Sequence, residues 1–346
     1  MLFKTATLSQ LAEFDEIIDV RSPAEFADDH IPGAINCPVL DDDERARVGT
    51  LYVQNSPFEA RKIGGVLVAK NIARHLETKF ADHPKSWRPL IYCWRGGQRS
   101  GAMSIILNQV GWAAHKLNGG YKAYRRHVLQ QMETLPATFN FRVLCGPTGS
   151  GKSRFLQALA DTGHQALDLE ALAQHRGSVL GQLPEAPQPT QKWFESTLLQ
   201  TLAQFDPARP VYVESESRRI GRLAVPASLL QTMHSGHCLS IETPAPVRVN
   251  ALLEDYPHFI ADKALLETQL AFLQPFHARK TLEDWRELIA AGDFPDLVAN
   301  LLEKHYDPAY FRALGKNYAD LAQAERLILS DLSPAALQVQ ADLLPR

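Results

Sequence analysis

The sequence predicts an α/β protein with two successive domains, each built on a mostly parallel sheet, followed by a helical C-terminal extension. Through residues 1–131 and again through 141–245, short apolar runs alternate with longer amphipathic runs. Such alternation is typical of parallel strands covered by helices. From 246 to 346 the apolar spacing is helical throughout. A chain of 346 residues also has the length of two or three ordinary domains.

The composition is that of a folded globular protein, with 45% hydrophobic and 22% charged residues. The net charge of -3 is close to neutral, so a nucleic-acid partner would have to be attracted by local basic patches. The N-terminus lacks a signal-peptide pattern, and no apolar run is long enough to span a membrane. We therefore expect a cytoplasmic protein without a membrane partner.

In the first domain, apolar runs at 16–20 and 89–93 predict strands, and the run at 61–76 predicts a helix. The first domain should end at residue 131, and residues 132–140 have the composition of a linker before the second domain. The second domain should begin with a strand at 141–145.

A reactive cysteine is expected where the strand at 89–93 ends. Cys93 opens a loop that leads into a helix, and backbone N–H groups and a helix N-terminus favour the thiolate there. Arg95 and Arg99 can add positive charge, while Gly96 and Gly97 allow the backbone to curl. The four cysteines lack CxxC spacing, which argues against a zinc site or a disulfide framework. The other three are expected to be packing residues: Cys37, Cys145 and Cys238.

On these residues the first domain resembles the rhodanese family. The matching motifs are Asp19-Val20-Arg21, Glu25-Phe26, the run from His30 to Asn36 and the Cys93 loop. The resemblance implies that Cys93 carries a persulfide or a related chalcogen adduct, and that the other motifs fix the fold. Five residues separate Cys93 from Arg99, where the common sulfurtransferase loop has four. A longer loop leaves room for a larger anion or for selenium.

A phosphate-binding loop is predicted at 146–153, between the strand at 141–145 and a helix at 154–163. The sequence GPTGSGKS satisfies the P-loop pattern in its usual strand-to-helix context. Its binding residues are expected to be Gly146, Thr148, Gly149, Ser150, Gly151, Lys152 and Ser153. The loop leaves room for a magnesium ion at the Ser153 hydroxyl. Its acidic partner stays open among Glu214, Asp168 and Glu170, each of which could equally be a surface carboxylate or a helix cap.

Taken together, the two modules make the chain similar to the bacterial tRNA 2-selenouridine synthases. The resemblance covers nearly the full length through CWRGGQRSGAMS, GPTGSGKS, DLEALAQHRGSVLG, VYVESESRRIG and YDPAY. It implies conversion of wobble 2-thiouridine in tRNA to 2-selenouridine, through geranylation by geranyl diphosphate and displacement of the S-geranyl group by selenium from selenophosphate. The partners would be tRNA, these two substrates and the synthetase that supplies selenophosphate. We expect a monomer with no firmly bound cofactor and no protein metal site.

In this interpretation, Cys93 carries selenium as a selenylsulfide or binds the selenium donor, and the P-loop holds the diphosphate, although a nucleotide there stays open. RNA contacts are expected at 125–127 and 218–222, and at Trp94, Tyr306 and Tyr310, which could stack on a base. A solvated helix face at the arginines and a core role for the tyrosines remain open.

Three other functions are compatible with the two loops. A P-loop kinase fused to a rhodanese regulator would turn over ATP without RNA. A cysteine-dependent phosphatase would hydrolyse aryl phosphates, although the loop offers no obvious acid for the leaving oxygen. A non-catalytic tRNA-binding scaffold would leave both loops unexplained.

Overall fold

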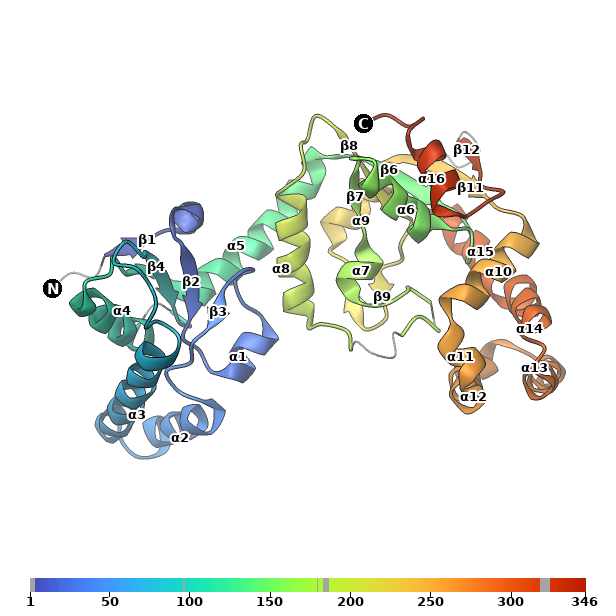
Figure 1. Cartoon of the computed structure of the whole chain (residues 1–346). Coiled ribbons are helices and arrows are strands. Elements are labelled where there is room, and N and C mark those ends of the chain that lie inside the picture. Colours follow the sequence, from blue (N-terminus) through green and yellow to red (C-terminus); the bar gives the residue numbers. More distant parts are fainter. Residues whose placement is uncertain (1–3, 96, 179, 183–186, 318–323) are drawn as a thin grey trace. The chain divides into compact units, whose positions relative to one another are not determined.

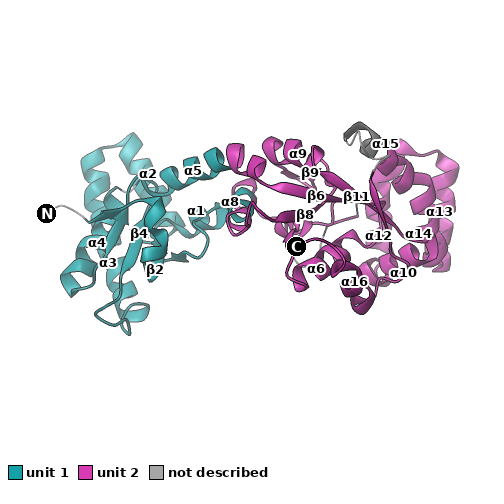
Figure 2. Cartoon of the chain, turned by 90° about the horizontal axis from the view of Figure 1, so that it is seen from above, with its two compact units in different colours: residues 1–131, 195–199 teal, residues 132–194, 200–346 magenta. Residues whose placement is uncertain are grey.

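The computed structural model describes residues 4–95, 97–178, 180–182, 187–317 and 324–346. The chain forms two compact units, coloured separately in Figure 2. Unit 1 comprises residues 1–131 and 195–199, and unit 2 comprises 132–194 and 200–346. Within the described residues, no helix is both long and apolar enough to cross a membrane.

Unit 1 contains a five-stranded sheet in the order β1-β5-β4-β2-β3, and every neighbouring pair is parallel. Its strands are β1 Thr5–Ala6, β2 Glu16–Asp19, β3 Ile35–Asn36, β4 Pro89–Tyr92 and β5 His115–Leu117. The parallel sheet expected for the first domain is therefore confirmed.

The helices of this part of the chain are η1 Leu8–Glu13, α1 Pro23–Asp28, α2 Asp42–Gln54, α3 Pro57–Thr78, α4 Gln98–Val110 and α5 Gly120–Thr134 (Figure 1). Local sequence sets several of their ends. Ser56 caps α3 by accepting a hydrogen bond from the Phe58 amide, with Pro57 at the first turn. Gly111, at φ +113°, ends α4. Ile72 of α3 and Met103 of α4 are fully buried in the core beneath this sheet.

Unit 2 contains a second five-stranded parallel sheet, in the order β12-β11-β6-β8-β7. Its strands are β6 Asn140–Cys145, β7 Gln165–Leu167, β8 Pro210–Glu214, β11 His237–Glu242 and β12 Glu325–Ile328, beside a small hairpin of β9 Arg219–Ile220 and β10 Leu223–Ala224. Because β6 lies in the middle, the loop that follows it emerges at the centre of one sheet edge.

The remaining helices are η2 Leu135–Thr138, α6 Lys152–Asp161, α7 Leu169–Ala173, α8 Gln191–Leu202, α9 Ala227–His234, α10 Ala245–Asp255, α11 Pro257–Ala261, α12 Lys263–Leu270, η3 Ala271–Phe276, α13 Arg279–Ala291, α14 Phe294–Leu301, the π-helical turn η4 Leu302–Tyr306, α15 Asp307–Asn317 and α16 Pro334–Ala341 (Figure 1). The segment expected as a linker, 132–140, holds the end of α5, all of η2 and the first residue of β6.

The described residues of unit 2 include two large hydrophobic clusters. One packs α6 and α16 on the sheet, and the other lies among the helices from α11 to α14. The helical extension expected after residue 245 is confirmed except at its C-terminal end, where β12 joins the sheet beside β11. This strand has only four residues, with two charged side chains, and pairs along one edge, so it lacks the long apolar run of a central strand.

Candidate functional site

Cys93 lies directly after β4, at the base of the loop that leads into α4. The residue is only 3% exposed and belongs to the core cluster of unit 1. Its Sγ lies 3.2 Å from the Ser100 hydroxyl, and its carbonyl accepts a hydrogen bond from the Tyr121 amide. The thiol is therefore almost completely buried, with the Ser100 hydroxyl in the first turn of α4 as a polar neighbour. Gly96 lies outside the described residues.

The two arginines of this loop have different surroundings. Arg95 is exposed, whereas Arg99 is half-buried and donates to the Glu25 carboxylate at 2.6 Å. Burial alone would raise the pKa of Glu25, but the hydrogen bond and charge of Arg99 hold that pKa below its usual value. An anion at the loop would therefore share Arg99 with Glu25.

The other rhodanese-like residues form a buried structural network. Arg21 donates to both carboxylate oxygens of Asp19 and to the Asp29 carbonyl. The Tyr121 ring lies 3.9 Å from the Arg21 guanidinium, and its hydroxyl donates to Asp29. Because Asp19 and Arg21 are buried, these residues stabilise the fold of unit 1 and do not contact a substrate.

The predicted phosphate loop follows β6 and ends at the first turn of α6. Gly149 and Gly151 have φ values of +77° and +83°, which other residues rarely adopt. The Lys152 ammonium donates to the Gly146 carbonyl at 2.7 Å. The Ser150 side chain is buried beneath the loop, and its carbonyl accepts a hydrogen bond from Thr243. The loop thus has the curled shape that turns N–H groups toward a phosphate.

A helix far along the chain anchors this loop. The buried Arg248 of α10 donates twice to the Thr148 carbonyl, and it pairs with Asp307 of α15 at 2.6 Å. Asp307 belongs to the YDPAY motif, whereas Arg248 stands in no recognisable motif. Only the fold brings residues 100 positions apart into contact.

Three carboxylates face the loop: Glu170, Glu214 and Glu216 have oxygens within 4.8 Å of one another. The Ser153 hydroxyl donates to Glu170 at 3.4 Å. Burial and mutual repulsion raise the pKa of Glu170 to about 9 and that of Glu214 to about 7, while Lys152 opposes both shifts. Such a cluster is a candidate cation site beside Ser153, which qualifies the expectation that the protein has no metal site.

Of the three acidic residues predicted as partners of the phosphate loop, two face the loop and one caps a helix. Asp168 caps α7 by accepting from the Ala171 amide at 2.8 Å, so its role is structural. Glu170 and Glu214 face the loop. Glu216 was not predicted because it follows the end of β8. Outside a strand, the residue pattern does not indicate which side chains face the phosphate loop.

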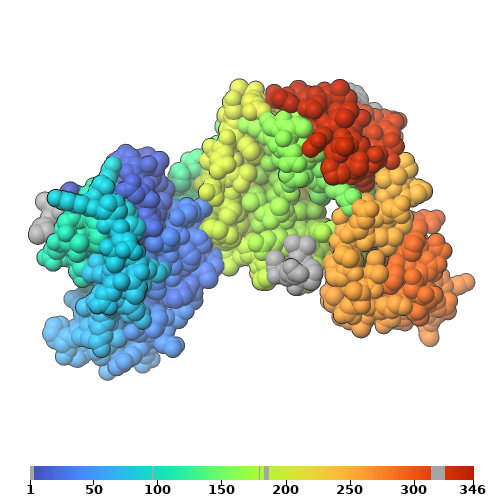
Figure 3. All heavy atoms as spheres, viewed as in Figure 1, coloured from blue at the N-terminus to red at the C-terminus, as the bar shows by residue number. Residues whose placement is uncertain are grey.

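A polar cavity of about 420 Å³ opens above the loop, between the loop, the carboxylates and residues of α10, η4 and α15. Figure 3 shows the surface hollowed where the green segment near residues 150–180 faces the orange helices. Tyr306 and Tyr310 line this cavity, and the Tyr310 ring lies 5.8 Å from the Lys152 ammonium. Both tyrosines therefore line the cavity, and Tyr306 also packs against the helical core, as its alternative core role predicted.

The candidate RNA-binding residues are at scattered places. Arg218, Arg219 and Arg222 are exposed at a β-hairpin, which corrects the alternative of a helix face. Arg125 pairs with Glu195, and Trp94 is 40% exposed. Several of these basic and aromatic side chains are accessible, but the described residues do not bring them together in one pocket.

Comparison with known proteins gives two family matches. Residues 5–127 match the rhodanese-like domain, and residues 139–290 match the tRNA 2-selenouridine synthase AAA domain. A rhodanese-related protein from Thermoplasma volcanium is similar to part of the chain, with 18% identity, a TM-score of 0.24, and coverage of 36% of this chain and 93% of that one.

Relatives named tRNA 2-selenouridine synthase align with most of the chain. The one from Bdellovibrio bacteriovorus is 39% identical over 69% of this chain and 64% of its own length. With this and two other relatives, the chain spans a little less than two thirds of the relative's length. The relative from Aeromonas salmonicida is 36% identical over 94% of this chain and 93% of its own, and that from Shewanella loihica is 32% identical over 88% and 89%. The chain belongs to the tRNA 2-selenouridine synthase family.

Proposed function

We propose that this protein replaces the sulfur of wobble 2-thiouridine in tRNA by selenium, in two half-reactions that use its two loops separately. The observation that carries the proposal is the phosphate loop, which faces a 420 Å³ cavity together with Lys152. A cavity of this size can take a diphosphate and an acceptor base.

In the first half-reaction, the sulfur of 2-thiouridine attacks C1 of geranyl diphosphate. The C–S bond forms, the C1–O bond breaks, and diphosphate leaves with the electron pair. The N3 proton of the base passes to solvent. The loop amides and Lys152 stabilise the charge that develops on the leaving oxygen. This role matches the position of Lys152 at the first turn of α6.

A divalent cation fits the carboxylate cluster of this site. Both oxygens of Glu214 are buried, and neither has a hydrogen-bond partner in the described part of the chain. Glu214, Glu170 and Ser153 would hold the ion, which would supply further positive charge toward the diphosphate. Magnesium is the ion that phosphate sites of this kind usually take.

In the second half-reaction, the selenium of selenophosphate attacks C2 of the S-geranylated base. The C2–S bond breaks and geranyl thiolate leaves; water then cleaves the P–Se bond to give phosphate and the 2-selenouridine. No atom changes its oxidation state. A selenylsulfide on Cys93 would instead need a two-electron oxidant to form. Because the first route needs no oxidant, we favour a Cys93 loop that binds and orients selenophosphate, with Arg95 and Arg99 beside its phosphate.

Separate variants of the two loops test this division. Cys93→Ala should abolish selenation and leave geranylation intact. Cys37→Ala is the matched control, because Cys37 is buried in the same core and should retain both steps. The measurement is nucleoside mass spectrometry of 2-thiouridine tRNA after incubation with geranyl diphosphate and then selenophosphate. Loss of both steps in a folded Cys93→Ala protein would refute the division.

Lys152→Ala should slow geranylation by about 10²- to 10³-fold, the usual effect of removing one group that stabilises a leaving oxyanion. The same variant should still selenate tRNA that was geranylated beforehand. Normal geranylation by Lys152→Ala, together with lost ATP turnover, would instead support the kinase alternative.

A further inference from the structure

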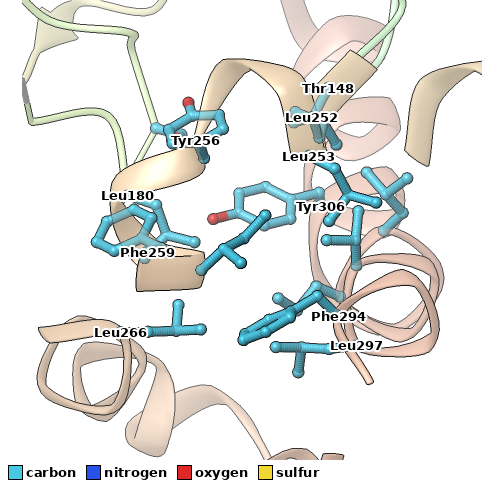
Figure 4. Close-up of a pocket in the computed structure, with 15 residues that line it drawn as sticks. Thr148, Leu180, Leu252, Leu253, Tyr256, Phe259, Leu266, Phe294, Leu297 and Tyr306 are labelled. Atoms are coloured by element: carbon cyan, nitrogen blue, oxygen red, sulfur yellow. The ribbon is translucent and has the colours of Figure 1, made fainter. Parts of the chain in front are cut away.

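An apolar pocket of about 70 Å³ lies in the helical part of unit 2. Leucine, phenylalanine and tyrosine side chains of α10, α11, α12, α14 and η4 make up most of its lining (Figure 4). None of its described lining residues is charged. The pocket thus suits a hydrocarbon group and would leave the polar atoms of a sugar or base without partners.

This pocket adjoins the phosphate cavity. Both are lined by the same five residues: Thr148, Ser178, Leu252, Tyr256 and Tyr306. Leu252 lies so close to the loop that a Cβ on Gly149 would come within 2.9 Å of its Cδ1. A ligand with its charged end on the loop therefore has an apolar space next to it, within the same unit.

We propose that this pocket binds the hydrocarbon chain of an isoprenoid diphosphate whose diphosphate lies on the phosphate loop. The inference deepens the proposed function and rests on it, because it gives the alkyl donor of the first half-reaction a second binding region. The polar cavity and the apolar pocket together match an amphiphile with a charged head and a short chain. A nucleotide would match the head region alone.

The far end of the pocket limits the length of that chain. Figure 4 shows Thr148 and Leu252 at one end and Leu266, Phe294 and Leu297 at the other. Leu266 and Leu297 are buried in the helical core, so this end is closed by packed side chains. The free volume of about 70 Å³ is about half that of an engineered apolar cavity that admits benzene, about 150 Å³. The pocket therefore takes only the distal end of the chain, and the carbons next to the diphosphate lie in the adjoining 420 Å³ cavity. A short isoprenoid chain should therefore be favoured over a long one.

Binding to the full-length protein tests the pocket apart from catalysis. By calorimetry, geranyl diphosphate should bind at least about tenfold more tightly than inorganic diphosphate, since even one methylene in an apolar pocket is worth about tenfold. Leu297→Trp should remove this excess and leave the affinity for inorganic diphosphate unchanged. Retained diphosphate binding also shows that the variant is folded.

A second variant changes the length of the pocket. Phe294→Ala should raise the ratio of farnesyl to geranyl transfer by about tenfold relative to the unmodified protein. Phe272→Ala is the matched control, because Phe272 is an exposed phenylalanine of the same helical region, outside the pocket lining. An unchanged ratio in Phe294→Ala would overturn the assignment.

The outcomes separate the two proposals. Equal affinities of the unmodified protein for inorganic and geranyl diphosphate would overturn the pocket inference alone. Failure to bind either compound would instead overturn the proposed role of the phosphate loop.

Discussion

Glu214 is a carboxyl group that the fold keeps away from water. It is 1% exposed, and its pKa is raised to about 7 by burial and by the neighbouring Glu216 and Asp168, against the opposing charge of Lys152. A carboxyl group whose pKa is higher in the folded state than in the unfolded state binds more protons when folded. The stability of the folded chain should therefore fall as pH rises from about 4.5 through 7.

Glu214→Gln should remove the part of this pH dependence that Glu214 contributes, because the amide stays neutral, whereas the raised pKa of Glu170 keeps its own part in both proteins. At pH 8 the variant should be more stable than the unmodified protein by about 2–3 kcal/mol. Urea denaturation at pH 5, 6.5 and 8 measures the effect. Magnesium should stabilise the unmodified protein at pH 8 and the variant much less. An equal loss of stability with pH in both proteins would contradict the prediction.

Residues of the two loops could be predicted because each loop is contiguous in sequence. Cys93 and Lys152 belong to short motifs that were predicted between a strand and a helix, and in the structure each lies at such a strand-to-helix connection. Arg248 and Glu216 could not be predicted, because their roles depend on which distant segments the fold brings to the loop. The apolar pocket was missed for the same reason, since leucines at helical spacing also describe an ordinary core.

Among the elements, the C-terminal pair of β12 and α16 completes the phosphate-binding fold. β12 extends the sheet beside β11, and α16 packs on α6, the helix that begins with Lys152. Leu332, just before α16, lies so close to the loop that a Cβ on Gly151 would come within 2.5 Å of its Cδ2. Sequence periodicity predicted helices here and overlooked the strand, because a short edge strand with charged residues carries little pattern.

Leu337→Ala in α16 should destabilise the protein by about 2–5 kcal/mol, the range for removing a buried leucine side chain. Leu337 is 1% exposed in the core between α6 and the sheet. Val339→Ala is the control on the same helix, because Val339 is 62% exposed, and it should change stability by less than about 0.5 kcal/mol. Thermal unfolding monitored by circular dichroism compares them. Equal effects would show that α16 does not support the fold in this way.

For the whole molecule, the proposed function raises the electrostatic question of how a chain with a net charge of -3 would attract tRNA. Overall charge cannot supply the attraction, so local arginines must. Arg218 and Arg219 are exposed at the β9–β10 hairpin of unit 2, directly after the strand that carries Glu214. Each RNA phosphate that they bind would release counterions from the RNA.

Replacing Arg218 and Arg219 together by alanine should weaken tRNA binding uniformly across tRNA sequences. The slope of log affinity against log salt concentration should decrease in magnitude by about 1 for each phosphate that the double variant no longer binds. Arg279→Ala provides the control, since this arginine is exposed on α13 and pairs with Glu283 of its own helix. Filter binding between about 50 and 200 mM salt measures the slopes. If the slope of the double variant equals that of the control, tRNA does not use the hairpin, and the basic side chains that bind it lie elsewhere.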